Sequence, residues 1–238
     1  QTAVVNNEAS RWGRSENTNR LKELEALLDQ VTEKSAVPGH EGPIRNTIYN
    51  ALPQWAKELA QIDEMGNMWV EVGPAGQATV FLAHMDEVGY EVESIDRSGV
   101  VNLTRLGGVV ETAWEGQPAL LQLDPFINKE SLPEAPALRG VFNARSKPEQ
   151  KQPDAMTAWF GMNRTQLEAT GVRVGMGVTG YKEGHRMGAF RYSSRSLDDR
   201  VGTTSLLFAL NQIDPEALKS KVIFTWTVRE EGGLRGAA

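Results

Sequence analysis

The chain has 238 residues, 40% of them hydrophobic, so it is long enough to bury a substantial core in one or two domains. A formal net charge of -6 argues against nucleic acid as a partner, and the absence of cysteine excludes disulfides and thiolate metal ligands. No stretch is long and apolar enough to span a membrane, so no membrane partner is expected.

The start of the chain gives a prediction about its compartment. Residues 1–5 lack the basic start and the apolar core of a signal peptide, and the first residue is Gln1 rather than Met. Such a start is typical of a mature end left by signal cleavage, or of a trimmed chain. We expect an exported, periplasmic protein, with the cytoplasm as the alternative.

The first 89 residues alternate between helical and strand patterns. Apolar residues at three- and four-residue spacing predict an amphipathic helix over about residues 18–34, and a second helix follows that Pro53 interrupts or kinks. The apolar stripe of the first helix, which we expect to pack in the core, consists of Leu21, Leu24, Leu28 and Val31. Gly66 and Asn67 between two short runs predict a hairpin.

Two apolar runs are rich in β-branched and aromatic residues. They cover residues 79–83 and 222–228, and each is typical of a fully buried strand in a parallel sheet. Residues 90–192 differ, because short alternating runs separated by turn formers predict a small β barrel or sandwich. The sequence therefore predicts an α/β fold, a sheet with flanking helices. A first catalytic part (1–89) and a second (193–238) enclose an inserted β domain (90–192).

Polar side chains follow both apolar runs. His84 and Asp86 come directly after the first, and Glu230 and Glu231 come directly after the second. In open α/β sheets, ligands bind beyond the carboxyl ends of the strands. One imidazole with several carboxylates is the ligand set of a zinc or cobalt hydrolase. The structural alternative is a hydrogen-bonded histidine and a solvated glutamate pair.

A further acidic pair, Asp198 and Asp199, precedes an apolar helical stretch over residues 201–210. Helix capping explains such a pair as well as metal binding does, because aspartate is favoured at the N-cap and in the first turn. The other two histidines are weaker candidates. We expect His40 to make a surface hydrogen bond, and His185 to lie in a turn.

Three segments together resemble the glutamyl and deblocking aminopeptidase family, the co-catalytic metallopeptidases that build tetrahedral assemblies. They are AHMDEVGY at 83–90, LDDRVG at 197–202 and TVREEGGLRGA at 227–237. Weaker matches at 36–41, 106–109 and 171–175 follow in the family's order. The resemblance implies an inserted β domain used in dimer contacts and substrate access, and hence a homo-oligomer formed through that domain.

The resemblance also implies a role for each residue of these motifs. His84 binds the first of two divalent metal ions, zinc or cobalt, and Asp86 holds the other nitrogen of the His84 ring. Asp198 bridges the two metals, and a cis peptide bond follows it. Glu230 is the general base and Glu231 is a ligand of the second metal.

The implied activity is that of an aminopeptidase, which uses a metal-activated water to hydrolyse N-terminal residues from a peptide substrate. The family pattern needs a further aspartate and histidine downstream of Glu231, whereas this chain ends at Ala238. We therefore expect an N-terminal fragment that binds metal weakly and is inactive by itself. Two alternatives remain, a metal-dependent amidohydrolase acting on a non-peptide amide and a non-catalytic assembly module.

Overall fold

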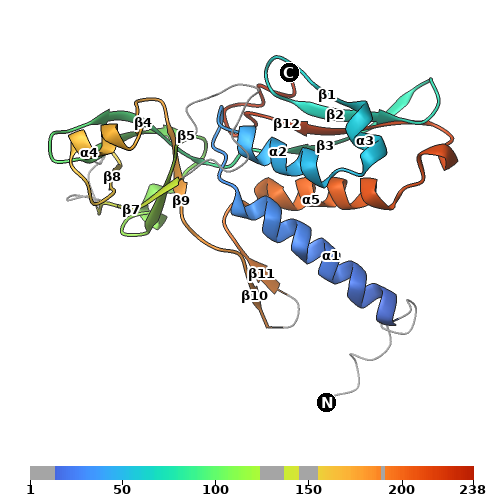
Figure 1. Cartoon of the computed structure of the whole chain (residues 1–238), viewed down its shortest axis with the longest axis horizontal. Helices are drawn as coiled ribbons and strands as arrows, with labels where there is room; N and C mark the ends of the chain where they lie inside the picture. The colour runs from blue at the N-terminus through green and yellow to red at the C-terminus, as the bar shows by residue number, and fades with distance from the viewer. Residues whose placement is uncertain (1–13, 124–136, 145–154, 189–190) are drawn as a thin grey trace.

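The computed structural model describes residues 14–123, 137–144, 155–188 and 191–238. Residues 1–5, on which the expectation of export rests, lie outside these ranges. None of the helices in the described part has the length and apolar character needed to cross a membrane. Figure 1 shows two adjoining parts, an α/β part and a β barrel.

The α/β part is built on a four-stranded sheet with the strand order β1-β2-β12-β3. Strands β1 (Ala60–Ile62) and β2 (Met68–Val72) form the predicted antiparallel hairpin. Strand β12 (Lys221–Thr227) pairs antiparallel with β2 and parallel with β3 (Ala78–His84), so the sheet is mixed.

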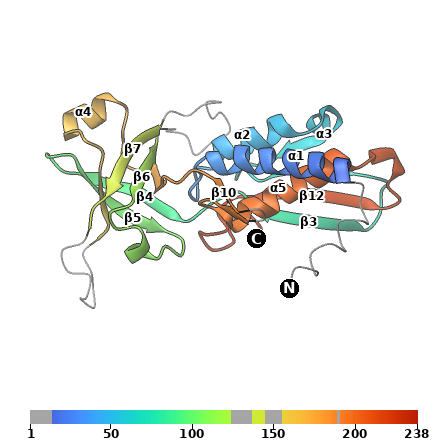
Figure 2. The ribbon, with the colours of Figure 1, turned by 90° about the horizontal axis from the view of Figure 1, so that it is seen from below.

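The main helices pack on one face of this sheet. They are α1 (Arg14–Glu33), α2 (Gly42–Ala51), α3 (Gln54–Leu59) and α5 (Leu197–Gln212). Pro53 separates α2 from α3, as predicted, because its ring cannot continue a helix. Alternate residues of β2 and β12 form the core with α2, α3 and α5, and Trp226 is fully buried there. Figure 2 shows α2 and α3 lying on one side of strands β12 and β3.

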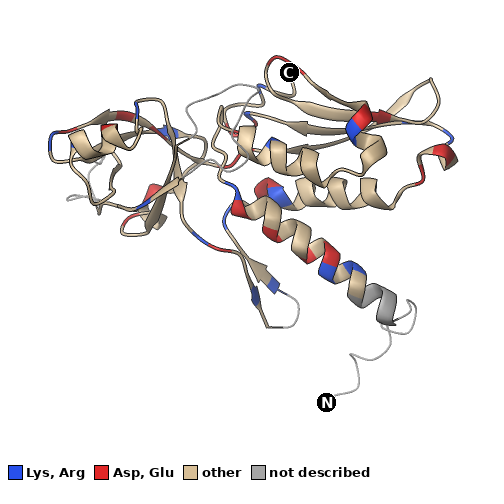
Figure 3. Cartoon of the chain, viewed as in Figure 1, with Lys and Arg blue, Asp and Glu red and all other residues tan. Residues whose placement is uncertain are grey.

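Helix α1 confirms the predicted helix but only part of its buried stripe. Val31 is fully buried, whereas Leu21 is exposed, because only the C-terminal half of α1 packs against the rest of the protein. Figure 3 shows acidic and basic residues spaced along the length of α1.

The prediction of two fully buried strands is wrong for β3 and holds only in part for β12, four of whose seven residues are half-buried. Val80, Phe81 and Leu82 are 55%, 47% and 52% exposed. In the described sheet β3 is an edge strand that pairs with β12 alone, and the helices cover one face only. The strand that carries the second motif, β12, lies instead in the middle of the sheet.

The inserted region forms a closed barrel with the strand order β4-β5-β8-β7-β6-β9, which confirms the predicted inserted β-barrel-like domain. Its strands are β4 (Gly89–Ile95), β5 (Val100–Leu106), β6 (Pro118–Gln122), β7 (Ala137–Phe142), β8 (Thr157–Trp159) and β9 (Gly177–Gly180). Tyr90, Val92, Leu121, Phe142 and Val178 belong to its own apolar core. The shorter elements are η1 (Glu111–Ala113), α4 (Arg164–Ala169) and η2 (Pro215–Ala217).

Two short strands, β10 (His185–Met187) and β11 (Arg191–Ser193), form a hairpin between the barrel and α5, on the same side as α1 (Figure 1). The domain boundaries at residues 89/90 and 192/193 stay predictions. The barrel itself begins at Gly89, and α5 begins at Leu197. The chain therefore leaves the α/β part directly after β3 and returns to it directly before α5.

Candidate active site

The ends of two parallel strands bring the two motifs together. His84 at the end of β3 pairs with Thr227 at the end of β12, and the Met85 amide donates a 2.8 Å hydrogen bond to the Thr227 carbonyl. Parallel strands end at the same edge of a sheet, so the residues after both strands gather there. This edge also faces the junction with the barrel, because β4 starts at Gly89.

Asp86 joins the segments that follow the two strands. Its carboxylate is fully buried and accepts hydrogen bonds from the backbone amides of Glu230, at 2.9 Å, and Glu231, at 3.0 Å. A buried carboxylate with two amide donors is a charge-assisted contact, stronger than a neutral hydrogen bond. Asp86 therefore fixes the backbone of the glutamate pair relative to His84.

His84 is the centre of the cluster. Its Nδ1 atom lies 3.1 Å from the Asp86 carbonyl and 3.5 Å from Asp86 Oδ1. Its Nε2 atom lies 3.0 Å from Asp198 Oδ1 and 3.7 Å from Glu230 Oε2. Burial lowers the pKa of His84, but the hydrogen bonds and negative charges of Asp86, Asp198 and Glu230 outweigh it and raise this pKa to about 9. Negative charge thus surrounds the ring.

Helix capping and contact with the His84 ring, the two explanations for the aspartate pair, belong to different residues of the pair. Asp198 faces the His84 ring, and its side chain is 86% exposed. Asp199 accepts a 2.8 Å hydrogen bond from the Gly202 amide and so caps the helical part of α5. The peptide bond between them is cis, as the resemblance implied, and both residues have non-helical backbone angles.

Glu231 is half-buried and lines two neighbouring cavities. The first, of about 620 Å³, is also lined by Asp198 and by residues of the inserted domain that include Trp114 and Gly180. The second, of about 600 Å³, lies against the 38–40 loop and the end of β5. Burial raises the pKa of the Glu231 carboxyl, against the lowering effect of His84.

The donors suit a divalent metal by type, because imidazole and carboxylate groups are the usual ligands of zinc in hydrolases. His84, Asp198 and Glu231 are the side chains that would hold such an ion. In the ranges that the structure describes, however, no three His, Asp or Glu side chains are arranged so that they could hold one metal ion together. The metal roles of these residues stay predictions.

Sequence reasoning missed the role of Glu41. This side chain is buried, and its Oε1 atom accepts hydrogen bonds from the amides of Gly39, at 2.9 Å, and Arg229, at 3.0 Å. Arg229 directly precedes the glutamate pair and has a φ of 56°, a left-handed conformation that needs support from its surroundings. The weak family match at residues 36–41 could have pointed to Glu41, but the resemblance implied no role for this residue.

Glu87 is the second residue that the sequence left without a role. It is buried, pairs with Arg195, and lies 3.5 Å from the guanidinium group of Arg200. The two arginines also bind carbonyl groups at the C-terminal end of α1, among them those of Thr32 and Lys34. These contacts join α1, the His84 segment and the start of α5.

The remaining histidines do not join the His84 cluster. His40 is buried rather than at the surface as expected, and its Nδ1 atom has no hydrogen-bond partner in the described part of the chain. Burial lowers the pKa of His40, aided by the charge of Arg229 and opposed by a hydrogen bond to the Gly175 backbone. His185 is exposed on β10 rather than in a turn.

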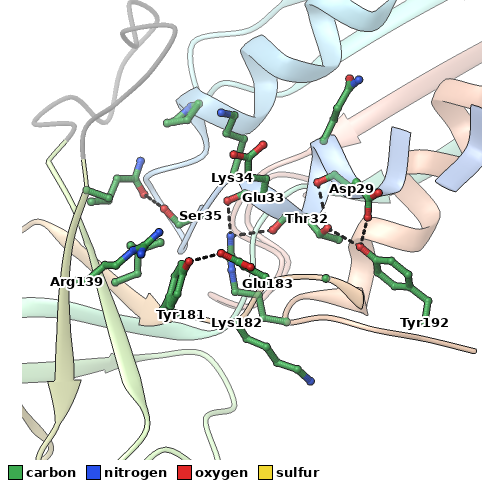
Figure 4. Close-up of a pocket in the computed structure, with 17 residues that line it drawn as sticks. Asp29, Thr32, Glu33, Lys34, Ser35, Arg139, Tyr181, Lys182, Glu183 and Tyr192 are labelled. Carbon is green, nitrogen blue, oxygen red and sulfur yellow. Dashed lines mark hydrogen bonds between the residues drawn. The ribbon is translucent and has the colours of Figure 1, made fainter. Parts of the chain in front are cut away.

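A larger cavity, of about 840 Å³, lies between the C-terminal end of α1, the barrel and the segment before β10 (Figure 4). Many of its polar groups are paired with one another. Tyr181 donates a hydrogen bond to Glu183, Tyr192 donates one to Asp29, and Arg139 stacks on the Tyr181 ring. None of the predicted catalytic or metal-binding residues lines this cavity.

Comparison with known proteins agrees with this geometry. The family profile described as M42 glutamyl aminopeptidase matches residues 66–238, which is most of the chain. The chain belongs to the M42 family. Its relatives include the lysyl aminopeptidase of Pyrococcus furiosus, 25% identical over 219 residues that cover 89% of this chain and 60% of that protein.

Solved M42-like structures share the fold. The aminopeptidase APDkam598 from the archaeon Desulfurococcus kamchatkensis has a TM-score of 0.78 and 25% identity, covering 92% of this chain and 59% of that one. The Pyrococcus horikoshii TET1 peptidase, which can assemble into a tetrahedron or a large octahedral shell, has a TM-score of 0.75 and 26% identity. That match covers 90% of this chain and 63% of that one. The chain thus spans about 60% of the length of the relatives it matches.

Proposed function

We propose that the intact M42 protein is a metal-dependent aminopeptidase that removes N-terminal residues from peptides, and that this chain supplies the N-terminal part of its site. The observation that carries the proposal is the meeting of His84, Asp198 and Glu230 at the carboxyl ends of β3 and β12, with ring-to-carboxylate distances of 3.0 and 3.7 Å. The sequence motifs around these residues are those that the family uses. Peptidases of this family are metal-dependent.

Each side chain has a task that its position supports. His84, Asp198 and Glu231 would hold two divalent ions, which would supply Lewis acidity to activate a water and to stabilise negative charge on the scissile carbonyl. Glu230 takes a proton from the attacking water and returns it to the leaving amine. Asp86 orients the His84 ring and, through its two amide contacts, keeps both glutamates in place.

The cavity that contains Asp198 and Glu231 is the proposed place for the N-terminal residue of the substrate. Its volume of about 620 Å³ is in the range of small-molecule sites, and the barrel supplies much of its wall. The free amine of the peptide lies near the Glu231 carboxylate. An N-acetylated peptide, which lacks that positive charge, is a poor substrate.

We also propose self-association through the barrel. The TET1 peptidase forms large assemblies, and this barrel exposes apolar side chains at Val110, Trp159 and Val174. Light scattering coupled to gel filtration measures the mass, and a monomer at all concentrations would contradict the proposal.

The activity is tested on the intact protein with matched peptides in buffer containing zinc or cobalt. Release of the N-terminal residue from a free peptide, no release from its N-acetylated form, and loss of release in Glu230→Gln are the expected results. Cleavage of the acetylated form at the same rate would instead favour an amidohydrolase. Metal binding without hydrolysis of any amide would favour a non-catalytic role.

A further inference from the structure

The second cavity beside Glu231 has a distinctive lining. It has a volume of about 600 Å³ and contains three arginines, Arg105, Arg229 and Arg235, against two carboxylates, Glu91 and Glu231. We call this cavity the arginine pocket. Arg105 comes from β5 of the barrel, whereas the other two arginines come from the segment after β12, so the pocket lies between the two parts of the molecule.

These three guanidinium groups differ in their contacts from most other arginines of the protein. Within the described ranges, none of them makes an ion pair or a side-chain hydrogen bond, whereas most other arginines of the same ranges are engaged. Arg195 and Arg200, for example, share Glu87. Guanidinium groups that line one cavity without forming an ion pair are suited to bind an anion, because their planar forks match carboxylate and phosphate geometry.

The backbone around the pocket is closely fitted. Gly107, with a φ of 79°, lies so near to Glu231 that an added Cβ atom would be 3.1 Å from the Glu231 Cβ atom. The Arg229 amide is held by Glu41 at 3.0 Å, and the Arg235 amide donates a 3.2 Å hydrogen bond to the Arg229 carbonyl. The pocket is therefore fixed directly against the proposed active site.

We propose that the arginine pocket binds the C-terminal carboxylate of a short peptide whose N-terminal residue occupies the cavity containing Asp198. The proposal rests on the proposed aminopeptidase function and narrows its substrates to short peptides. Glu231 lines both cavities, so a peptide that crosses it places its amine on one side and its carboxylate on the other. An extended tripeptide reaches about 10 Å, which sets the scale of the preferred length.

Binding of three ligands to the intact protein carrying Glu230→Gln tests this without the need for turnover. Calorimetry in zinc-containing buffer compares trialanine, trialanine amide and N-acetyltrialanine. The amide should bind at least about tenfold more weakly than trialanine, because a charge-assisted contact is lost. Adding Arg105→Gln or Arg235→Gln should lower the affinity for trialanine to that for trialanine amide, and should leave the affinity for the amide unchanged.

The control is Arg97→Gln. Arg97 lies in the exposed turn of the same β4–β5 hairpin and does not line the pocket, so this change should leave all three affinities unaltered. Equal affinities of trialanine and its amide would overturn the proposal, as would an equal effect of Arg105→Gln on both. Acetate or inorganic phosphate that binds as tightly as trialanine would assign the pocket to free anions and would also overturn it.

The third ligand separates this proposal from the proposed function. N-acetylation removes the positive charge of the peptide's amino group, which we expect to bind near the Glu231 carboxylate. If acetylation weakens binding while amidation does not, the aminopeptidase site stands and the carboxylate pocket fails. If amidation weakens binding while acetylation does not, the pocket binds a carboxylate but the peptide's amino group is not bound at the proposed aminopeptidase site. The proposed restriction to short peptide substrates then fails.

Discussion

The buried carboxyl group of Glu41 should make folding stability depend on pH. Burial, and to a lesser extent the charge of Asp86, raises its pKa from 4.5 to about 7, although backbone amides, including those of Gly39 and Arg229, oppose the shift. In the unfolded chain the group is solvated and ionises near its ordinary value. The folded state therefore holds this proton more tightly than the unfolded state does.

The sign and size follow from this difference. Below pH 4.5 both states are protonated and Glu41 contributes no pH-dependent term. Between about 4.5 and 7 the unfolded state ionises first, so the free energy of unfolding falls as the pH rises. Above about pH 7 the full cost applies, on the order of 3 kcal/mol for this pKa difference.

Glu41→Gln keeps a side-chain oxygen for the Gly39 and Arg229 amides but cannot ionise. Its buried NH₂ group adds a cost that is constant with pH. The free energy of unfolding of the variant, minus that of the wild type, should therefore increase by about 3 kcal/mol between pH 4.5 and 8. Urea unfolding followed by tryptophan fluorescence, with EDTA present, measures it at each pH.

The exposed Glu23 of α1 provides the control, and Glu23→Gln should give a profile parallel to that of the wild type. If the Glu41→Gln profile is also parallel to the wild type over this pH range, Glu41 is ionised in the folded protein at low pH. The assignment of a buried, protonated carboxyl would then be wrong.

Three further predictions concern the motifs. In the intact protein Asp198→Asn should lower the zinc content after dialysis, whereas Asp199→Ala should retain it and lose only stability, about 1 kcal/mol for a helix cap; elemental analysis and thermal melts distinguish them. In the intact enzyme Glu230→Gln should keep metal but cut peptide hydrolysis by roughly a hundredfold or more, whereas Glu231→Gln should weaken metal binding, and the reverse pattern would exchange their roles. Arg200→Met should destabilise the fold by about 3 kcal/mol or more in urea unfolding, because it removes one of the two arginines beside the buried Glu87 carboxylate; a change below about 1 kcal/mol would contradict this.

Local patterns predicted much of the fold, because most of its elements are specified by near neighbours. The 3.6-residue period gave α1, Pro53 gave the break between α2 and α3, and Gly66-Asn67 gave the first hairpin. The exposure of β3 was not predictable, because a run of apolar residues looks the same at the edge and in the middle of a sheet. Which strand is central depends on long-range pairing.

The candidate site was predictable to the level of residues but not of contacts. The motifs indicated His84 and Asp198, and the structure places their side chains 3.0 Å apart. The sequence could not tell which aspartate of the pair caps the helix and which faces His84, because that depends on the backbone angles of Asp198 and Asp199. Glu41 was missed because its partners are backbone amides, which no side-chain pattern reveals.

The barrel is joined to the rest of the chain by a short outgoing connection, residues 85–88, and by a longer returning one that carries the β10–β11 hairpin, and both are also parts of the proposed site. The outgoing connection contains Asp86, and the returning one ends at Leu197, next to Asp198. A rigid rotation of the barrel therefore pulls on both halves of the ligand set at once. Such coupling is reciprocal. If a bound metal favours one orientation of the barrel by a given factor, a contact that holds the barrel in that orientation raises the affinity for the metal by the same factor. A neighbouring subunit that grips the barrel would in this way act on the metal centre without touching it.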